Sequence, residues 1–217
     1  MNTKQSVALV STSALAAGMA QGSVVYSGSL NLQQTFDSNN YRQAVNITGG
    51  ANSDFYFGYE TAANKPYVDA RNPLGTTSQS GLVSILGKAN NGLPVTTAGT
   101  MIDASYASLY PVVDGSIGAR GYMYYNDAGD TVIGDWSNTA VTDAYVGIEL
   151  SLSGGTSYGW VHFIDNPTTS PVSLTLVDWA YQSTPGVGIQ ASVIPEPSTA
   201  AFAGLGIASL LIRRKRR

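Results

Sequence analysis

Short hydrophobic segments that alternate with polar residues, separated by turn-forming residues, run through most of this 217-residue chain. A period of two places apolar side chains on one face of a strand, and no segment carries a helical period over four turns. The pattern therefore predicts an all-β domain over residues 23–191, built as a β-sandwich, with the jelly roll as a candidate form. The expected strands are Val24–Tyr26, Leu30–Gln34, Ala44–Ile47, Asp54–Tyr59, Gly81–Leu86, Gly121–Tyr125, Tyr145–Leu152, Tyr158–Ile164 and Val172–Tyr181.

The clearest local unit is a hairpin in the last third of the chain. The glycine-rich stretch Ser153–Thr156 separates two alternating segments, and short glycine-rich turns join antiparallel strands. The second strand is expected to carry two distinct faces. One holds Tyr158, Trp160, His162 and Ile164, and the other holds Gly159, Val161 and Phe163.

Basic residues are concentrated at the two ends of the chain. Lys4 and Arg213–Arg217 supply six of the eleven, which leaves five basic and thirteen acidic residues between Gln21 and Pro195, a net charge of −8. A body with this charge repels phosphate backbones, so nucleic acid is not an expected partner. Cysteine is absent, which excludes a disulfide framework and a cysteine nucleophile.

The N-terminus has the features of a secretory signal peptide over residues 1–22. Lys4 precedes the largely apolar stretch Val7–Ala17, and small residues follow it. Cleavage is expected after Ala20 or after Gly22, because both positions have small residues at −1 and −3. An ordinary buried helix is the alternative interpretation.

The C-terminal segment, residues 192–217, combines a proline motif, an apolar stretch and a basic end. Pro195-Glu196-Pro197 should stay extended and accessible, because two prolines fix φ and remove two backbone donors. Ser198–Ile212 has 15 uncharged residues. As a helix it spans about 22 Å, so it crosses a hydrocarbon core of about 30 Å only with local thinning and snorkelling side chains. The basic cluster that would hold the cytoplasmic side is Arg213, Arg214, Lys215, Arg216 and Arg217.

These three parts, in this order, resemble the PEP-CTERM sorting signal that exosortase recognises. The resemblance implies transfer across the inner membrane by the secretion machinery and cleavage near Pro195–Pro197. It also implies release or reattachment at the cell surface, in bacteria that make exopolysaccharide. A plain tail anchor is the alternative.

Parts of the middle domain are similar to a group of β-rich PEP-CTERM proteins. This resemblance implies no activity. The segments that carry it are Val24–Gly28, Asn52–Phe55, Tyr158–Val161, Asp178–Tyr181 and Thr184–Gly186.

Few residues have the types and spacing that catalysis needs. His162 is the single histidine, so a serine hydrolase triad would need it beside a serine and an aspartate such as Asp165 or Asp178. Glu60 and Glu149 are the glutamates that remain after processing, and a glycosidase needs two carboxylates on either side of one bond. Neither pattern is marked by a motif, so no catalytic residues are assigned and the chain is not expected to be an enzyme.

One acidic stretch offers oxygen ligands to a metal ion. Asp127, Asp130 and Asp135 are candidates for binding Ca²⁺, although their spacing differs from that of an EF-hand loop. A solvated acidic turn is the alternative. No other cofactor is expected.

The sequence favours an exported surface or extracellular-matrix protein with a structural role. A carbohydrate-binding module is the alternative, followed by an enzyme acting on polysaccharide. The residues that could stack on sugar rings are Tyr122, Tyr124, Tyr125, Trp136 and Trp179. Expected partners are exosortase, the secretion machinery, the inner membrane during sorting, and exopolysaccharide.

Overall fold

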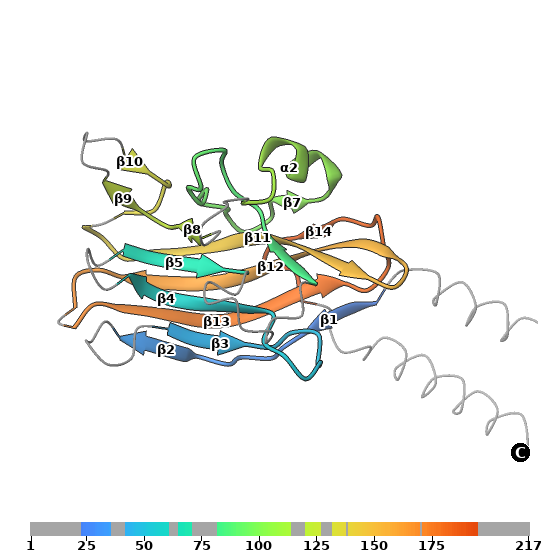
Figure 1. The fold of residues 1–217 in the computed structure, drawn as a ribbon, viewed down its shortest axis with the longest axis horizontal. Helices are drawn as coiled ribbons and strands as arrows, with labels where there is room; N and C mark the ends of the chain where they lie inside the picture. The colour runs from blue at the N-terminus through green and yellow to red at the C-terminus, as the bar shows by residue number, and fades with distance from the viewer. Residues whose placement is uncertain are drawn as a thin grey trace, which may run out of the picture.

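The computed structural model describes residues 23–35, 42–60, 65–70, 82–113, 120–126, 132–137, 139–169 and 171–194. Within these ranges the protein consists of antiparallel strands and a single short helix, α2 (Ala104–Leu109), which confirms the all-β prediction (Figure 1). The strands are β1 (Val24–Tyr26), β2 (Leu32–Thr35), β3 (Arg42–Val45), β4 (Phe55–Glu60), β5 (Lys65–Asp69), β6 (Val83–Ile85), β7 (Met101–Ile102), β8 (Arg120–Tyr122), β9 (Tyr125–Asn126), β10 (Val132–Ile133), β11 (Thr142–Leu152), β12 (Gly155–Asn166), β13 (Ser173–Gln182) and β14 (Ile189–Gln190).

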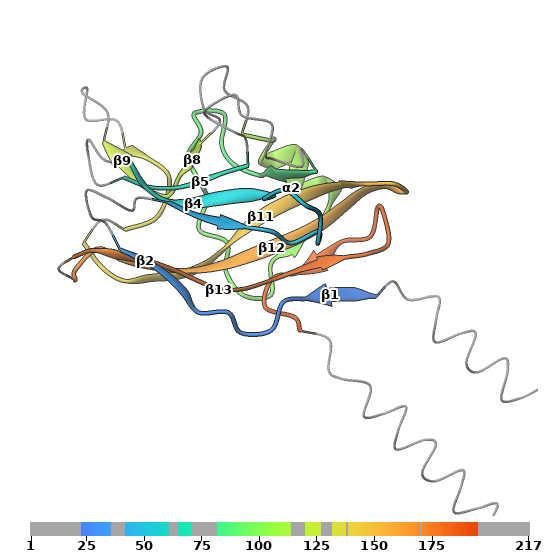
Figure 2. The same cartoon turned by 60° about the horizontal axis from the view of Figure 1, so that its bottom comes forward.

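The largest sheet is built around three long strands. Its order is β1-β13-β12-β11-β6. Strand β1 pairs with the C-terminal half of β13 and β2 with its N-terminal half, so β1 and β2 lie one after the other along the same edge of the sheet (Figure 2). The predicted hairpin joins β11 to β12, with Leu152 paired to Gly155. Gly155 has a φ of 127°, a conformation that favours glycine and explains its place in the turn.

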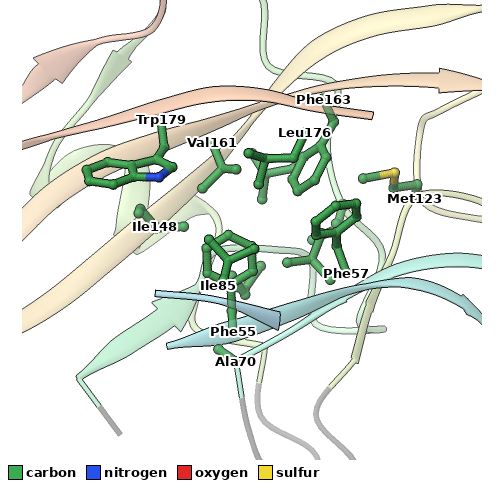
Figure 3. Close-up of a cluster of buried hydrophobic side chains, with 14 of the residues drawn as sticks. Phe55, Phe57, Ala70, Ile85, Met123, Ile148, Val161, Phe163, Leu176 and Trp179 are labelled. Atoms are coloured by element: carbon green, nitrogen blue, oxygen red, sulfur yellow. The ribbon is translucent and has the colours of Figure 1, made fainter. Parts of the chain in front are cut away.

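A second sheet, with the order β3-β4-β5-β8, faces the first through the main hydrophobic core. Alternate residues of β4 enter this core, where the rings of Phe57 and Phe163 lie 5.4 Å apart (Figure 3). Ala144, Val146, Ile148 and Leu150 of β11 are fully buried in the same cluster. The alternation that the sequence predicts therefore places the apolar faces of both sheets against each other.

The opposite face of the long strands is covered as well. There β7 pairs with β14, and Ile102 and Ile189 pack with Trp160 in a second buried cluster. Helix α2 lies over β11 at Gly147, where a Cβ atom would stand 2.7 Å from the Tyr106 ring. The predicted separation of faces on β12 is confirmed, since Tyr158 and Trp160 belong to this cluster while Val161 belongs to the main core.

Some elements were missing from the predicted set. Strand β5 contains Pro66 and lacks an alternating pattern, yet it pairs along β4, and the Pro66 carbonyl accepts from the Met123 N–H. Helix α2 has only six residues, too few for a helical period to be visible. It begins after Asp103, whose carboxylate accepts from the backbone N–H groups of Ser105 and Tyr106.

Replacing Gly159 with alanine should destabilise the fold. A Cβ atom there would lie 2.7 Å from the Ala180 carbonyl oxygen and 2.8 Å from the Tyr181 Cβ, so strands β12 and β13 would have to shift. We expect a loss of about 1–3 kcal/mol in the free energy of unfolding, measured by urea denaturation. Gly50→Ala is the control, because the nearest atom to its Cβ is 3.7 Å away. Equal stabilities of the two variants would contradict the close approach at Gly159.

Candidate functional site

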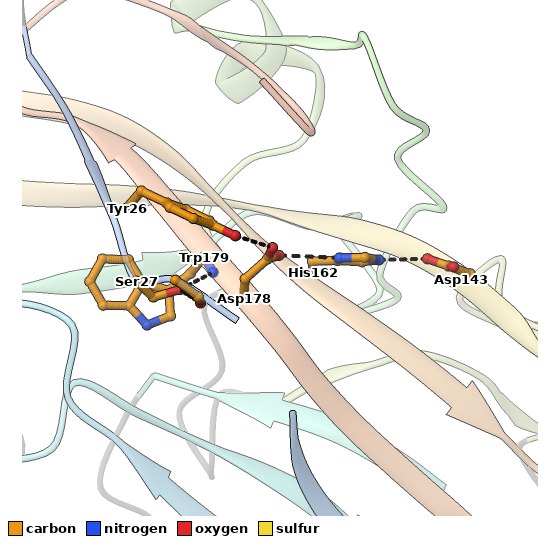
Figure 4. A network of polar contacts seen from close by, with 7 residues as sticks. Tyr26, Ser27, Asp143, His162, Asp178 and Trp179 are labelled. Carbon is orange, nitrogen blue, oxygen red and sulfur yellow. Dashed lines mark hydrogen bonds and ion pairs between the residues drawn. The ribbon is translucent and has the colours of Figure 1, made fainter. Parts of the chain in front are cut away.

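A group of polar and aromatic side chains surrounds His162 on the face of the large sheet that is turned away from the main core. We call it the His162 cluster (Figure 4). Strand register assembles it, because His162 on β12 lies directly opposite Asp178 on β13 and Tyr145 on β11. The members are Tyr26, Asp143, Tyr145, His162 and Asp178.

Both ring nitrogens of His162 face carboxylates. Nε2 lies 2.5 Å from an Asp143 oxygen, and Nδ1 lies 3.2 Å from Oδ1 of Asp178. The hydroxyl of Tyr26 donates to Oδ2 of Asp178 over 2.8 Å. The Asp178 side chain is 10% exposed and that of Asp143 is 62% exposed, so the Asp178 contacts are the better shielded from water.

Aromatic rings hold the imidazole in place. The Tyr145 ring stacks on it with centroids 4.5 Å apart and an angle of 19°, and Trp160 meets Tyr145 edge-on at 5.3 Å. Burial, and then the Asp178 carboxylate, raise the pKa of the Tyr26 and Tyr145 hydroxyls. Both phenols therefore remain protonated, and Tyr26 remains a hydrogen-bond donor at neutral pH.

The arrangement differs from a hydrolase triad. In a triad one imidazole nitrogen faces a carboxylate and the other faces a serine hydroxyl, whereas here the second nitrogen faces Asp143. A neutral imidazole has one N–H, so both contacts are hydrogen bonds at once only when the ring is an imidazolium. The cluster thus joins strands β1, β11, β12 and β13 through side-chain contacts, and a carboxylate stands where a triad has its serine.

The other candidate partner of His162, Asp165, lies elsewhere. It is fully buried on the core side of β12, where Tyr59 donates to its Oδ1 over 3.2 Å. Burial raises the pKa of Asp165 to about 7, and the Tyr59 hydrogen bond opposes that shift only partly. Of the two aspartates considered for a triad, the structure brings only Asp178 to the histidine.

The two glutamates point away from the main core on opposite sides of it. Glu60 is the last residue of β4 and lies on the outer face of the four-stranded sheet. There its carboxylate accepts a hydrogen bond from the Tyr122 hydroxyl and lies 3.6 Å from the Arg120 guanidinium. Glu149 lies on β11 opposite Tyr158, on the far face of the large sheet. The packed core between them prevents this pair from enclosing one glycosidic bond.

The expected calcium ligands are only partly placed. Asp127 and Asp130 lie outside the described residues, and Asp135 contacts the Lys88 ammonium at 2.5 Å. The described ranges contain no group of three or more metal-ligating side chains. Calcium binding therefore stays a prediction.

The sorting residues also lie outside the described part of the chain. These are Pro195, Glu196 and Pro197 together with the basic cluster of Arg213–Arg217, and the predicted signal peptide 1–22 is likewise not described. No helix in the described ranges is long and apolar enough to span a membrane, and the predicted apolar segment Ser198–Ile212 falls beyond them.

The candidate sugar-stacking tryptophans are core residues. Trp136 and Trp179 are 3% and 9% exposed and both belong to the main hydrophobic cluster. Trp136 also donates from Nε1 to the Pro94 carbonyl. Neither ring presents a face to a ligand, and packing explains both.

Sequence reasoning missed three members of the His162 cluster: Tyr26, Asp143 and Tyr145, of which Tyr145 lies directly opposite His162. Asp143 lies one diagonal step from His162 across the β11–β12 pair, and Tyr26 stands in the same relation to Asp178 across β1–β13. The strands that carry Tyr26, His162 and Asp178 were predicted over these residues, but the strand that carries Asp143 was predicted to begin only at Tyr145, and the register was not predicted. Counting outward from the hairpin turn at Gly155 would have placed Asp143 next to His162.

Removing the charge of Asp178 should cost more stability than removing that of Asp143. Asp178→Asn weakens shielded contacts to both His162 and Tyr26, and we expect a loss of about 1–3 kcal/mol in the free energy of unfolding. Asp143→Asn changes an exposed contact to the same ring and should cost less than about 1 kcal/mol. Urea denaturation of both variants is the measurement, and a larger loss for Asp143→Asn would reverse our assignment.

Replacing Asp165 with asparagine should remove a component of the pH dependence of stability. The folded state holds this proton up to a pKa of about 7, whereas an unfolded aspartate loses it near about 4, so stability falls as pH rises between these values. Asp165→Asn should match the parent near pH 4 and exceed it at pH 8 by on the order of 2–4 kcal/mol. Urea denaturation across this range is the test, with Asp135→Asn as the exposed control. Parallel profiles for parent and Asp165→Asn would contradict the shift.

Comparison with known proteins gives one match, at the C-terminus. No curated protein and no solved structure matches the chain significantly. Residues 193–217 match the family model of the PEP-CTERM protein-sorting motif, which confirms the resemblance seen in the sequence. The chain therefore carries a PEP-CTERM sorting motif, and this motif implies an exported protein that exosortase sorts to the cell surface.

Proposed function

We propose that the chain delivers a non-catalytic β domain to the cell surface or extracellular matrix, where that domain has a structural role. In this proposal exosortase cleaves near Pro195–Pro197, the inner membrane holds the tail only during sorting, and the two larger sheets act as one β-sandwich. Two observations support this proposal: the matched sorting motif, and the position at which the described domain ends.

The main support for the proposal is the position at which the folded domain ends. The last backbone pairings are from Ala191 N–H to the Thr100 carbonyl at 2.9 Å and from Val193 N–H to the Gln190 carbonyl at 3.2 Å. The matched motif begins at Val193. Cleavage near Pro195–Pro197 would therefore leave every described strand in place, so the released domain keeps its stabilising contacts.

A structural role is further supported by how the reactive side chains are used. His162 is held between two aspartates, and Asp165 is buried in the core beside Tyr59. Trp136 and Trp179 are packed in the core. These side chains, which a polysaccharide-acting enzyme or a carbohydrate-binding module could have used, thus make contacts within the protein instead.

The intact mass of the protein recovered from its native host tests the processing step. We expect a mature chain that lacks about the last 20 residues. Glu196→Ala should leave the tail in the membrane but reduce cleavage, because the change removes the charged residue of the motif. Removal of Arg213–Arg217 should weaken membrane retention, since these charges hold the cytoplasmic side. A mature chain that still ends at Arg217 would rule out cleavage and leave a tail-anchored protein.

A further inference from the structure

Two uncharged segments meet where the chain leaves the domain. Residues 89–102 and 183–194 contain no Asp, Glu, Lys or Arg, although the body of the chain has a net charge of −8. The two segments are held together by the β7–β14 pair. Four apolar side chains on them, which we call the exit face, are between 41% and 45% exposed: Met101, Val187, Val193 and Ile194.

The contacts in this region hold the backbone of the exit-face segments around one pair of strands, β7 and β14. Met101 pairs with Gln190, and its sulfur lies 3.0 Å from the Cβ position of Gly188, beside Val187. The Val193 N–H donates to the Gln190 carbonyl, which brings the end of the chain to the same pair of strands. The neighbouring residues in each strand, Ile102 and Ile189, are buried against the large sheet, so Met101 and Gln190 face outward.

The length of chain beyond the domain limits how far this face can be from a membrane. Only Pro195, Glu196 and Pro197 separate Ile194 from the predicted membrane segment that starts at Ser198. Fully extended, this connection spans about 14 Å. The headgroup region on each side of the hydrocarbon core is about 6 Å thick, so the exit residues cannot stand far above it.

We infer that, before the tail is removed, the exit face rests on the lipid surface of the inner membrane. The inference depends on the membrane step of the proposed function. Apolar side chains gain by leaving water for the interface, and the two segments that form the face contain no carboxylate that would lose hydration there. The next acidic residue, Asp103, is committed to capping helix α2. The contact also orients the domain so that Pro195–Pro197 stays at the membrane surface, where a membrane-bound processing enzyme can reach it.

Spin labels test this contact directly, because the chain has no native cysteine. The exported protein with its tail intact is reconstituted into vesicles of phosphatidylethanolamine and phosphatidylglycerol. Labels are attached at Met101→Cys or Val187→Cys on the exit face, and at Leu205→Cys in the middle of the predicted membrane segment. Leu32→Cys is the matched control, because Leu32 is an apolar residue with 38% exposure on β2, at the other half of β13.

The measurement compares collision of each label with oxygen, which concentrates in lipid, and with a water-soluble nickel chelate. We expect a severalfold higher ratio of oxygen to nickel accessibility at Met101 and Val187 than at Leu32. Water-like values at Met101 and Val187 with a lipid-embedded Leu205 would overturn the inference and leave the proposed function intact. Shielding of the exit-face labels from both reagents would indicate a protein partner and also overturn it. A water-exposed Leu205 label would contradict the membrane step itself.

Discussion

Burial of both faces of the three long strands is the constraint on which the rest of the structure depends. β11, β12 and β13 place Val146, Val161 and Leu176 in the main core, while Trp160 and Ala180 on their other face enter the second cluster. A sheet with two apolar faces needs cover on both sides. The four-stranded sheet covers one side, and β7, β14 and α2 cover part of the other.

Polar side chains gather on that second face next to the part that β7, β14 and α2 cover. Beyond Trp160 the strands carry His162, Asp178 and Asp143 in place of apolar residues. The irregularity in pairing between His162 and Phe163 falls at this transition. The His162 cluster therefore marks the boundary between the apolar and polar parts of one sheet face. Its charge-assisted contacts replace the apolar packing that ends there.

Strands were predictable from the sequence where apolar and polar residues alternate strongly. The prediction failed where tertiary contacts determine whether a segment forms a strand. β11 and β12 are long and have a glycine turn between them, so their existence, hairpin connection and face assignment followed from sequence. β5 was missed because Pro66 is unfavourable in a strand, and the tertiary contact from Met123 to its carbonyl compensates. The His162 cluster was predictable only in part. Asp178 was considered beside His162, but Asp143 and Tyr26 reach it through strand register, which alternation alone leaves undetermined.

The placement of the chain ends connects this architecture to sorting. β1 begins at Val24 and pairs with the edge of β13, and the Ser183 N–H donates to the Ser23 carbonyl at the first described residue. At the other end, β14 pairs with β7 and closes the second cluster through Ile189. Each end is thus fixed by contacts that lie inside the predicted processing points. The last described strand, β14, ends at Gln190, before the matched motif begins at Val193, so the motif and the strands occupy separate parts of the chain. The sorting signal is thus separate in sequence from the fold, and the function of the domain resides in its own surfaces.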